Sequence, residues 1–350
     1  MAEIELVKPD WIAGSEKRFF DFIYKLGGEK ICLMSHNDLD GISSAKVVNS
    51  VVRADMLKVA NYSDLNDSLV IELKKNKIKK LIIVDMSVQR VEVIKEIEKF
   101  AEILWIDHHT MIQDINSEKT VFLNAQGFCA AYLCYYLFSK LQNLDNMDWL
   151  IACASIADWL YTKNKSWMKE VLEKYGDQFI LEDDGLIKTS GKFYDLMYKL
   201  TLMIVYFEKK PMSVFEMIGL GFAEVKDLDK YSAIVLNEIN NKEKQFEKEK
   251  EFMKWGYFWC FESKFGIDSI LISNLSRNVK DKTFIFVFMD QKYCFINARR
   301  QDGKVDLPNL LRDLIRGFDD SSAGGHLKAS GGNFPRKYLE EFKKRLKEMK

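Results

Sequence analysis

The chain lacks several features that mark common classes of protein. Lys plus Arg and Asp plus Glu both number 52, so the formal net charge is zero. A zero net charge argues against a generally basic nucleic-acid coat protein, although a local basic groove can coexist with an acidic metal site. The six cysteines are scattered, with no Cys-x-x-Cys pair. We therefore expect no structural zinc site and a cytoplasmic location.

Signals for membranes and export are also missing. The N-terminus is charged and lacks the apolar core of a signal peptide. No apolar run approaches the roughly 18–20 residues that a membrane-spanning helix needs. Internal repeats and low-complexity tracts are absent as well. These absences predict that the chain has no membrane partner. Its length of 350 residues predicts two domains with a helical connector.

Histidine is scarce, and all four copies stand in acidic or glycine-rich motifs. His36 opens His-Asn-Asp-Leu-Asp-Gly, His108 and His109 close Asp-His-His, and His326 follows two glycines. The first two motifs directly follow apolar runs, and so does Asp85. Because imidazole and carboxylate together suit divalent transition metals such as Mn²⁺, this arrangement predicts a metal site.

Apolar strands alternate with helices in the first third of the chain. Strands are predicted at 31–35, 57–62, 81–84, 103–106 and 121–123, and helices at 15–26, 42–54, 66–76 and 90–100. This alternation indicates an α/β domain in which helices cover a parallel sheet. Ligands bind outside the carboxyl ends of such strands, so His36, Asp85 and Asp107 should converge there.

From residue 127 the pattern becomes helical. Helices are predicted at 128–141, 146–161, 166–175, 193–208 and 229–254. Within the last of them, 240–248 is polar nearly all round, which favours a solvated connector, with a partner-binding helix as the alternative.

The last hundred residues have a different, strand-rich pattern. Strands are predicted at 257–261, 270–272, 284–288 and 293–296, a hairpin turn at 290–292, and helices at 307–317 and 336–349. The predicted organisation is an N-terminal parallel-sheet α/β domain (1–190), a helical connector (191–255) and a smaller C-terminal α/β domain (256–350).

Seven side chains of the first domain are candidates for the metal site. They are His36, Asp38, Asp40, Asp85, His108, His109 and Asp158. Asp38 and Asp40 could serve two ions, and Asp85, alone at its strand end, could bridge them. Two ions about 3.5–4 Å apart can activate a water and stabilise the leaving oxygen of a phosphoester. Each motif alone has a plainer interpretation, such as a capped helix, but their joint occurrence in order favours the metal site.

These motifs resemble the four motifs of the DHH phosphoesterase superfamily. The resemblance rests on His36-Asn37-Asp38-Leu39-Asp40-Gly41, Val84-Asp85, Asp107-His108-His109 and Asp158. Near the C-terminus, Gly324-Gly325-His326-Leu327-Lys328-Ala329-Ser330-Gly331 resembles the glycine-rich signature of the DHHA1 domain, and Asn297-Ala298-Arg299-Arg300 resembles its Ser-x-Arg segment. The superfamily includes RecJ-type single-strand exonucleases, nanoRNases with pAp phosphatase activity, and cyclic-dinucleotide phosphodiesterases.

The resemblance implies a role for each residue. His36, Asp38 and Asp85 match the ligands of one Mn²⁺ ion, and Asp40, Asp85, His108 and Asp158 match those of a second, with Mg²⁺ or Co²⁺ as substitutes. His109 matches the catalytic histidine that faces the scissile phosphate, and Asp107 is expected to orient an imidazole. Four C-terminal residues match contacts to the substrate phosphate or nucleotide: Arg299, Gly324, Gly325 and His326.

Two positions depart from the DHHA1 signature. Ala323 replaces its first glycine, and Ser330 replaces its second alanine. Both residues are small, so we expect an anion-binding loop whose backbone amides can approach a phosphate.

The resemblance implies metal-assisted hydrolysis of phosphodiesters. We expect a RecJ-like exonuclease that acts on single-stranded DNA or short RNA. One alternative is a nanoRNase or pAp phosphatase, and a more remote one is a non-catalytic replication scaffold, against which the filled ligand positions argue. A homo-oligomer and a replication or repair protein partner stay open.

Overall fold

The computed structural model describes residues 4–182 and 185–349. The chain forms two compact units, Met1–Ser232 and Ala233–Lys350. These units do not mark a separate connector, so the predicted boundaries at 190 and 255 stay predictions. Among the described residues, no helix is long and apolar enough to cross a membrane.

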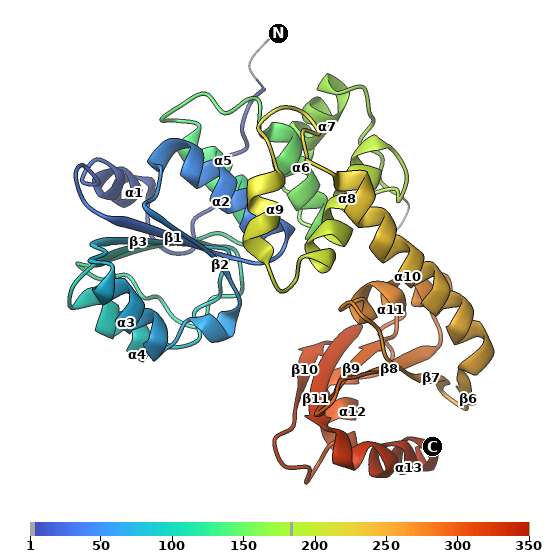
Figure 1. Ribbon diagram of the computed structural model, residues 1–350. Coiled ribbons are helices and arrows are strands. Elements are labelled where there is room, and N and C mark those ends of the chain that lie inside the picture. Colours follow the sequence, from blue (N-terminus) through green and yellow to red (C-terminus); the bar gives the residue numbers. More distant parts are fainter. Residues whose placement is uncertain (1–3, 183–184, 350) are drawn as a thin grey trace. The chain divides into compact units, whose positions relative to one another are not determined.

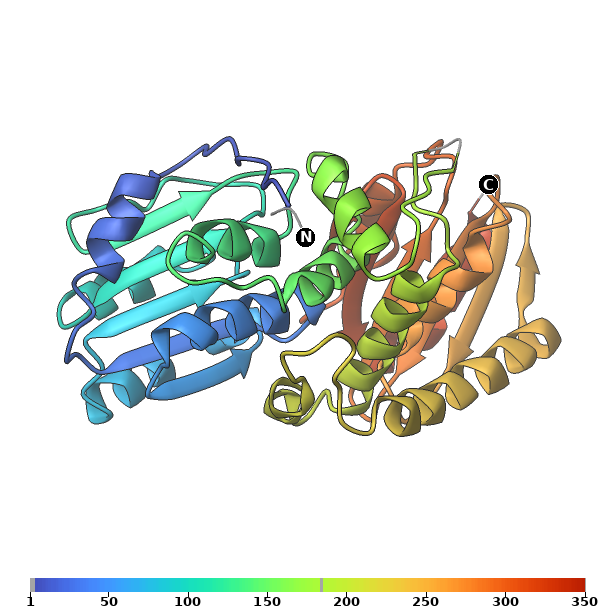
Figure 2. The same ribbon diagram turned by 90° about the horizontal axis from the view of Figure 1, so that it is seen from above.

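The first unit is built on a parallel sheet of five strands in the order β2-β1-β3-β4-β5. The strands are β1 (Ile31–His36), β2 (Met56–Ala60), β3 (Lys80–Val84), β4 (Glu102–Asp107) and β5 (Thr120–Asn124). All five predicted strands are therefore present, and the predicted α/β class is confirmed. Figure 2 shows the arrows of this sheet, coloured from blue to green, running side by side.

Helices cover both faces of this sheet (Figure 1). On one face lie α3 (Asp67–Lys75) and α4 (Val91–Glu98), and on the other lie α1 (Glu16–Ile23), α2 (Leu39–Val52) and α5 (Ala130–Phe138). Strand β3 is buried at every position, with Leu81 in one core and Ile82 in the other. Burial on both faces explains why this strand is a continuous apolar run.

Helix α2 begins three residues earlier than predicted because Asp38 caps it. The Asp38 Oδ1 accepts a hydrogen bond of 2.9 Å from the Gly41 amide. A side chain added at Gly41 would come within 2.3 Å of the His36 carbonyl oxygen, so the connection between β1 and α2 is tight. The His-x-Asp-x-Asp-Gly motif is thus a capped helix start, as its plainer interpretation proposed.

The rest of the first unit is helical, as predicted. It contains α6 (Asp148–Ala157), α7 (Lys165–Lys174), α8 (Lys192–Tyr206) and α9 (Pro211–Met217), of which α9 was not predicted. Helix α10 (Leu228–Glu249) follows and passes into the second unit.

Helix α10 corrects the prediction of a solvated helix. Its Val235, Ile239 and Phe246 are buried, and the Phe246 ring lies 5.6 Å from Trp259 and 5.2 Å from Phe286 between centroids. The apolar stripe is not evident in the sequence of residues 240–248, because only one residue in three or four of this helix faces the core and the others are polar.

The second unit contains a mixed sheet of six strands in the order β10-β11-β9-β8-β7-β6. The strands are β6 (Glu251–Met253), β7 (Gly256–Phe261), β8 (Thr283–Met289), β9 (Tyr293–Arg299), β10 (Ser322–His326) and β11 (Ala329–Pro335), and the helices are α11 (Asp268–Ser276), α12 (Leu307–Leu314) and α13 (Leu339–Glu348). The strand predicted at 270–272 is wrong, since these residues lie within α11. The turn predicted at 290–292 is present, where Asp290 Oδ1 accepts from the amides of Lys292 and Tyr293.

Candidate metal centre

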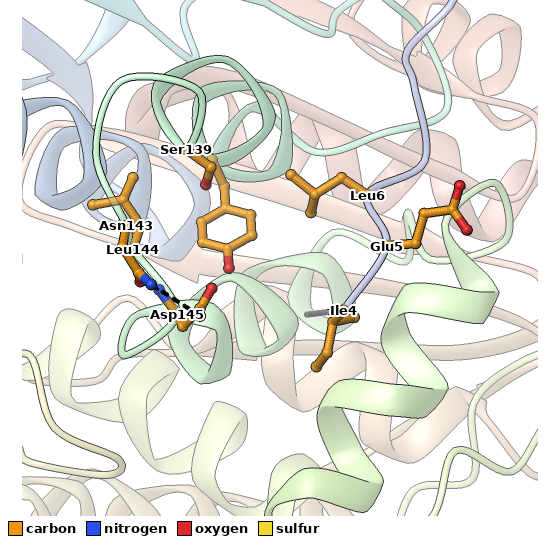
Figure 3. Close-up of a pocket in the computed structure, with 8 residues that line it drawn as sticks. Ile4, Glu5, Leu6, Ser139, Asn143, Leu144 and Asp145 are labelled. Atoms are coloured by element: carbon orange, nitrogen blue, oxygen red, sulfur yellow. Dashed lines mark hydrogen bonds between the residues drawn. The ribbon is translucent and has the colours of Figure 1, made fainter. Parts of the chain in front are cut away.

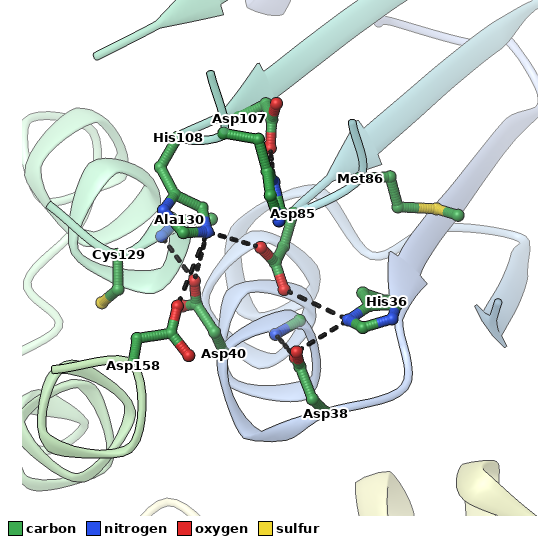
Figure 4. Close-up of polar contacts among 12 residues, drawn as sticks. His36, Asp38, Asp40, Asp85, Met86, Asp107, His108, Cys129, Ala130 and Asp158 are labelled. Atoms are coloured by element: carbon green, nitrogen blue, oxygen red, sulfur yellow. Dashed lines mark hydrogen bonds and ion pairs between the residues drawn. The ribbon is translucent and has the colours of Figure 1, made fainter. Parts of the chain in front are cut away.

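The predicted ligands meet at the carboxyl edge of the first sheet (Figure 4). Strand β3 pairs with both β1 and β4, so the ends of these three strands are adjacent. His36 is the last residue of β1, Asp85 directly follows β3, and Asp107 is the last residue of β4. Asp158 lies at the C-terminal end of α6. The convergence predicted from the strand ends is therefore found.

Two groups of ligand atoms share Asp85. On one side, His36 Nδ1 lies 2.7 Å from Asp38 Oδ2 and 3.8 Å from Asp85 Oδ2. On the other side, His108 Nε2 lies 3.2 Å from Asp85 Oδ1, 3.5 Å from Asp158 Oδ2 and 3.7 Å from Asp40 Oδ2. The two oxygens of one carboxylate thus face two different imidazoles.

Asp40 is held from behind by the start of α5. Its two oxygens accept hydrogen bonds of 2.7 Å from the amides of Ala130 and Ala131, and the residue is fully buried. Burial and the nearby charge of Asp38 raise the pKa of Asp40 to about 7. Although burial opposes it, the hydrogen bond from His36 lowers the pKa of Asp38 to about 2. Neighbouring carboxylates with such different proton affinities are typical of a functional site.

Asp85 is the most constrained of these carboxylates. It is 1% exposed, no described residue donates a hydrogen bond to its Oδ2, and its backbone φ of 57° lies in the left-handed region. Burial, followed by the charges of Asp40, Asp38 and Asp158, raises its pKa well above the ordinary value. A non-glycine residue in this conformation costs about 1–3 kcal/mol, which is tolerated at functional sites. A buried carboxylate oxygen that accepts no hydrogen bond from the described residues fits a site for a cation.

Beside this cluster, Asp107 orients His109. The Asp107 Oδ1 lies 2.7 Å from His109 Nδ1, and Asp107 is 2% exposed. Burial lowers the pKa of His109, but the hydrogen bond and charge of Asp107 outweigh it and raise the pKa above its usual value. In contrast, burial lowers the pKa of His108, which keeps that imidazole neutral and able to bind a metal.

One residue of the site was not predicted from the sequence. Tyr62 follows β2, and its hydroxyl lies 3.1 Å from His109 Nε2. Its position just past a strand end was the available signal, because the strand-end rule that found His36 applies equally to β2.

The predicted substrate residues gather in the second unit. Arg299 ends β9 and pairs with Ala329 of β11, which pairs in turn with His326 of β10. Burial lowers the pKa of the Arg299 guanidinium, and the charge of Asp268 opposes this effect. Arg299 and His326 therefore lie on one line across three strands.

Gly324 and Gly325 lie in strand β10 and not in the loop that we expected, because they pair with Gly331 and Ser330 of β11. Gly325 has a φ of 134°, and a side chain there would come within 2.6 Å of the Ala329 carbonyl oxygen. Ser330 is buried, and its hydroxyl donates a hydrogen bond of 2.6 Å to the Gly324 carbonyl. Serine, which stands where the DHHA1 signature has alanine, therefore adds a hydrogen bond between β10 and β11.

A separate hollow of about 480 Å³ lies between the N-terminal segment and α5 (Figure 3). Its lining includes Leu6, Tyr135, Ser139, Leu144 and Asp145. It contains no histidine and none of the residues of the metal centre.

Comparisons with known proteins agree with this arrangement. Residues 30–163 match the profile of the DHH family, N-terminal domain. Exonuclease RecJ bound to manganese superposes with a TM-score of 0.68 at 15% identity, covering 99% of this chain and 96% of that chain. No curated protein sequence matches the chain.

Two further structures share the fold at low identity. RecJ from Thermus thermophilus in complex with Mn²⁺ gives a TM-score of 0.72 at 14% identity; the match covers 99% of this chain but 55% of that one, so this chain spans about half its length. A pGpG-specific phosphodiesterase, PggH from Vibrio cholerae, gives 0.53 at 10% identity over 91% of this chain and 98% of that one. These likenesses establish the fold.

Proposed function

We propose that the chain, whose residues 30–163 match the DHH family, is a Mn²⁺-dependent exonuclease that hydrolyses single-stranded DNA or short RNA to mononucleotides. The observation that carries this proposal is the Asp85 carboxylate, whose two oxygens face the His36 group and the His108 group. Such a shared carboxylate is what a pair of ions requires.

The donor set fits two divalent transition-metal ions. His36 and Asp38 would hold one ion, and Asp40, His108 and Asp158 would hold the other, with Asp85 between them. Two imidazoles among four carboxylates favour Mn²⁺ or Co²⁺ over Mg²⁺, which prefers oxygen ligands and retains its water. When bound, two such ions supply an activated water and stabilise the charge that develops on a phosphoester.

Residues of the chain itself would position the substrate phosphate. With its Nδ1 held by Asp107, His109 keeps one ring orientation, and its raised pKa favours the protonated imidazole that stabilises a phosphoryl oxygen. In the second unit, the Arg299 guanidinium suits the bidentate recognition of phosphate.

Basic residues at one end of the second sheet favour an oligonucleotide over a mononucleotide as the substrate. The Arg300 amide donates to the Lys328 carbonyl, and the Asp302 amide donates to the Lys280 carbonyl, so these segments meet at the end of β9 that carries Arg299. Lys280 and Lys328 are exposed there. Exposed lysines attract the phosphates of a nucleic-acid strand without reading its sequence.

The proposal is tested by incubating the protein and Mn²⁺ with end-labelled 5-mers and 30-mers of DNA and RNA, and with pAp and pGpG. We expect mononucleotides to appear from single strands and to disappear in Asp85→Asn. The matched control is Asp21→Asn, which changes an exposed carboxylate of α1. If the protein hydrolyses only pAp or pGpG, the exonuclease proposal gives way to a second candidate, a nanoRNase or a phosphatase of small nucleotides.

That second candidate is a nanoRNase or a phosphatase of small nucleotides. The observation in its favour is the likeness to the pGpG-specific phosphodiesterase, which spans 98% of that chain. A non-catalytic scaffold is disfavoured because all six ligand positions carry a histidine or an aspartate, and these side chains lie close together.

A further inference from the structure

Tyr62 is placed at the metal centre by a capped turn. Strand β2 pairs with β1 so that Ala60 lies opposite His36, the last residue of β1. Asn61 then caps the short helical turn η1 (Tyr62–Asp64), and its amide donates a hydrogen bond of 2.8 Å to Asp64 Oδ2. The turn is therefore fixed at both ends, and it brings Tyr62 to the end of the neighbouring strand.

The Tyr62 side chain contacts two histidines of the site at once. Its ring centroid lies 4.7 Å from that of His36, with 31° between the ring planes. Its hydroxyl lies 3.1 Å from His109 Nε2, and the two rings are nearly perpendicular at 84°. One side chain from the turn after β2 thus bridges an imidazole at the end of β1 and another just after β4.

The partners of His109 define the direction of this hydrogen bond. Because the Asp107 carboxylate accepts from Nδ1–H, a neutral His109 presents the lone pair of Nε2 to Tyr62, whose hydroxyl donates to it. If His109 is protonated, Nε2–H donates to the Tyr62 oxygen instead, since a phenol can both donate and accept. The pair therefore stays hydrogen-bonded in both states of the imidazole, which phenylalanine could not achieve.

We propose that Tyr62 is a positioning residue of the metal centre, whose hydroxyl fixes the ring of His109 while its own ring covers His36. The role in catalysis rests on the proposed hydrolysis of phosphoesters, in which His109 faces the substrate. Burial and the surrounding charges of Asp85 and Asp38 raise the pKa of Tyr62, so its hydroxyl keeps its proton throughout the working range. Fixing the imidazole before substrate binds avoids an entropic cost during the reaction.

The hydrogen bond is tested first without metal or substrate. The chain has four histidines, so long-range ¹H–¹⁵N spectra of the imidazoles are simple, and His109→Gln assigns the resonances of His109. We expect Tyr62→Phe to shift the Nε2 resonance of His109. The control is Tyr24→Phe, which removes the hydroxyl of a tyrosine that is 74% exposed and should leave all four imidazoles unchanged. An unchanged His109 Nε2 in Tyr62→Phe overturns the proposal.

Kinetics with Mn²⁺ test the consequence for catalysis. Loss of one hydrogen bond predicts that Tyr62→Phe lowers kcat about three- to tenfold, with KM and bound Mn²⁺ nearly unchanged. Tyr62→Leu should lower kcat further because the ring over His36 is lost as well, and its melting temperature shows whether it folds. A wild-type kcat in Tyr62→Phe overturns the positioning role. If the wild-type protein hydrolyses no phosphoester, the proposed function fails, and the imidazole spectra still decide whether Tyr62 holds His109.

Discussion

Replacing Asp85 by asparagine should stabilise the metal-free protein and abolish its response to metal. The carboxylate is 1% exposed, its Oδ2 accepts no hydrogen bond within the described part of the chain, and Asp38, Asp40 and Asp158 surround it with like charge. Asparagine keeps the shape of the side chain without the charge, and it tolerates the left-handed backbone at this position.

The expected gain in the free energy of unfolding comes from the removed charge. A buried, unsatisfied charged group costs more than a neutral polar one, and we take about 1–3 kcal/mol as the gain. For a unit of this size, 1 kcal/mol corresponds to about 2–4 °C, which predicts a rise in Tm of about 2–12 °C.

The gain should depend on pH with a defined sign. Because burial raises the pKa of Asp85 in the folded state, the wild-type protein loses stability as pH rises from about 4 through that pKa. Asp40, with a pKa of about 7, acts in the same direction. The advantage of Asp85→Asn in metal-free buffer should therefore be smallest at the acid end of the range and grow as pH rises.

Thermal melts in EDTA and in MnCl₂ between pH 4.5 and 8 measure both effects. Mn²⁺ should raise the Tm of the wild-type protein because an ion that binds the folded state stabilises it, and it should leave Asp85→Asn nearly unchanged. The exposed Asp21→Asn should behave as wild type in every buffer. An Asp85→Asn protein that is less stable than wild type in EDTA at pH 8, or that gains as much from Mn²⁺, would refute the reasoning.

Three further predictions concern the metal and the second unit. Activity should require Mn²⁺ or Co²⁺, with Mg²⁺ weaker, and full hydrolysis by EDTA-treated protein would contradict this. Arg299→Ala and His326→Ala should raise KM for oligonucleotides more than for bis-p-nitrophenyl phosphate, with Mn²⁺ content by mass spectrometry unchanged; loss of Mn²⁺ in either would reassign these residues. In urea unfolding, Gly325→Ala should destabilise the protein by about 1–3 kcal/mol because of its positive φ. Gly324→Ala should change little, since no atom of the described residues lies within 4 Å of the added methyl group.

The fold and the position of the site were predictable because both depend on strand ends. Apolar runs such as Leu81–Val84 are buried on both faces, so they stand out in the sequence, and the acid or imidazole after each run lies at one edge of the sheet. The glycine-rich strand β10 could not be predicted in this way, because Gly324 and Gly325 have low strand propensity and only pairing with β11 makes them a strand.

Contacts made by backbone or by irregular turns were also beyond prediction. The amides that hold Asp40 belong to two alanines, and a peptide N–H has no signature in the sequence. Tyr62 reaches His109 only because a three-residue turn follows β2, and such turns have no periodicity to detect. The helix at 268–276 was misread since a short apolar run fits strand and helix equally well.

The hydrogen bonds from α5 to Asp40 connect the metal centre to backbone amides that can be measured without a substrate. Ala130 and Ala131 donate their amides to a carboxylate that faces His108, so the strength of these two hydrogen bonds changes with the charge on Asp40. The rate of hydrogen–deuterium exchange at these two amides should therefore differ between the metal-free and the metal-bound protein. We expect the first turn of α5 to report the occupancy of the metal centre without any substrate being present.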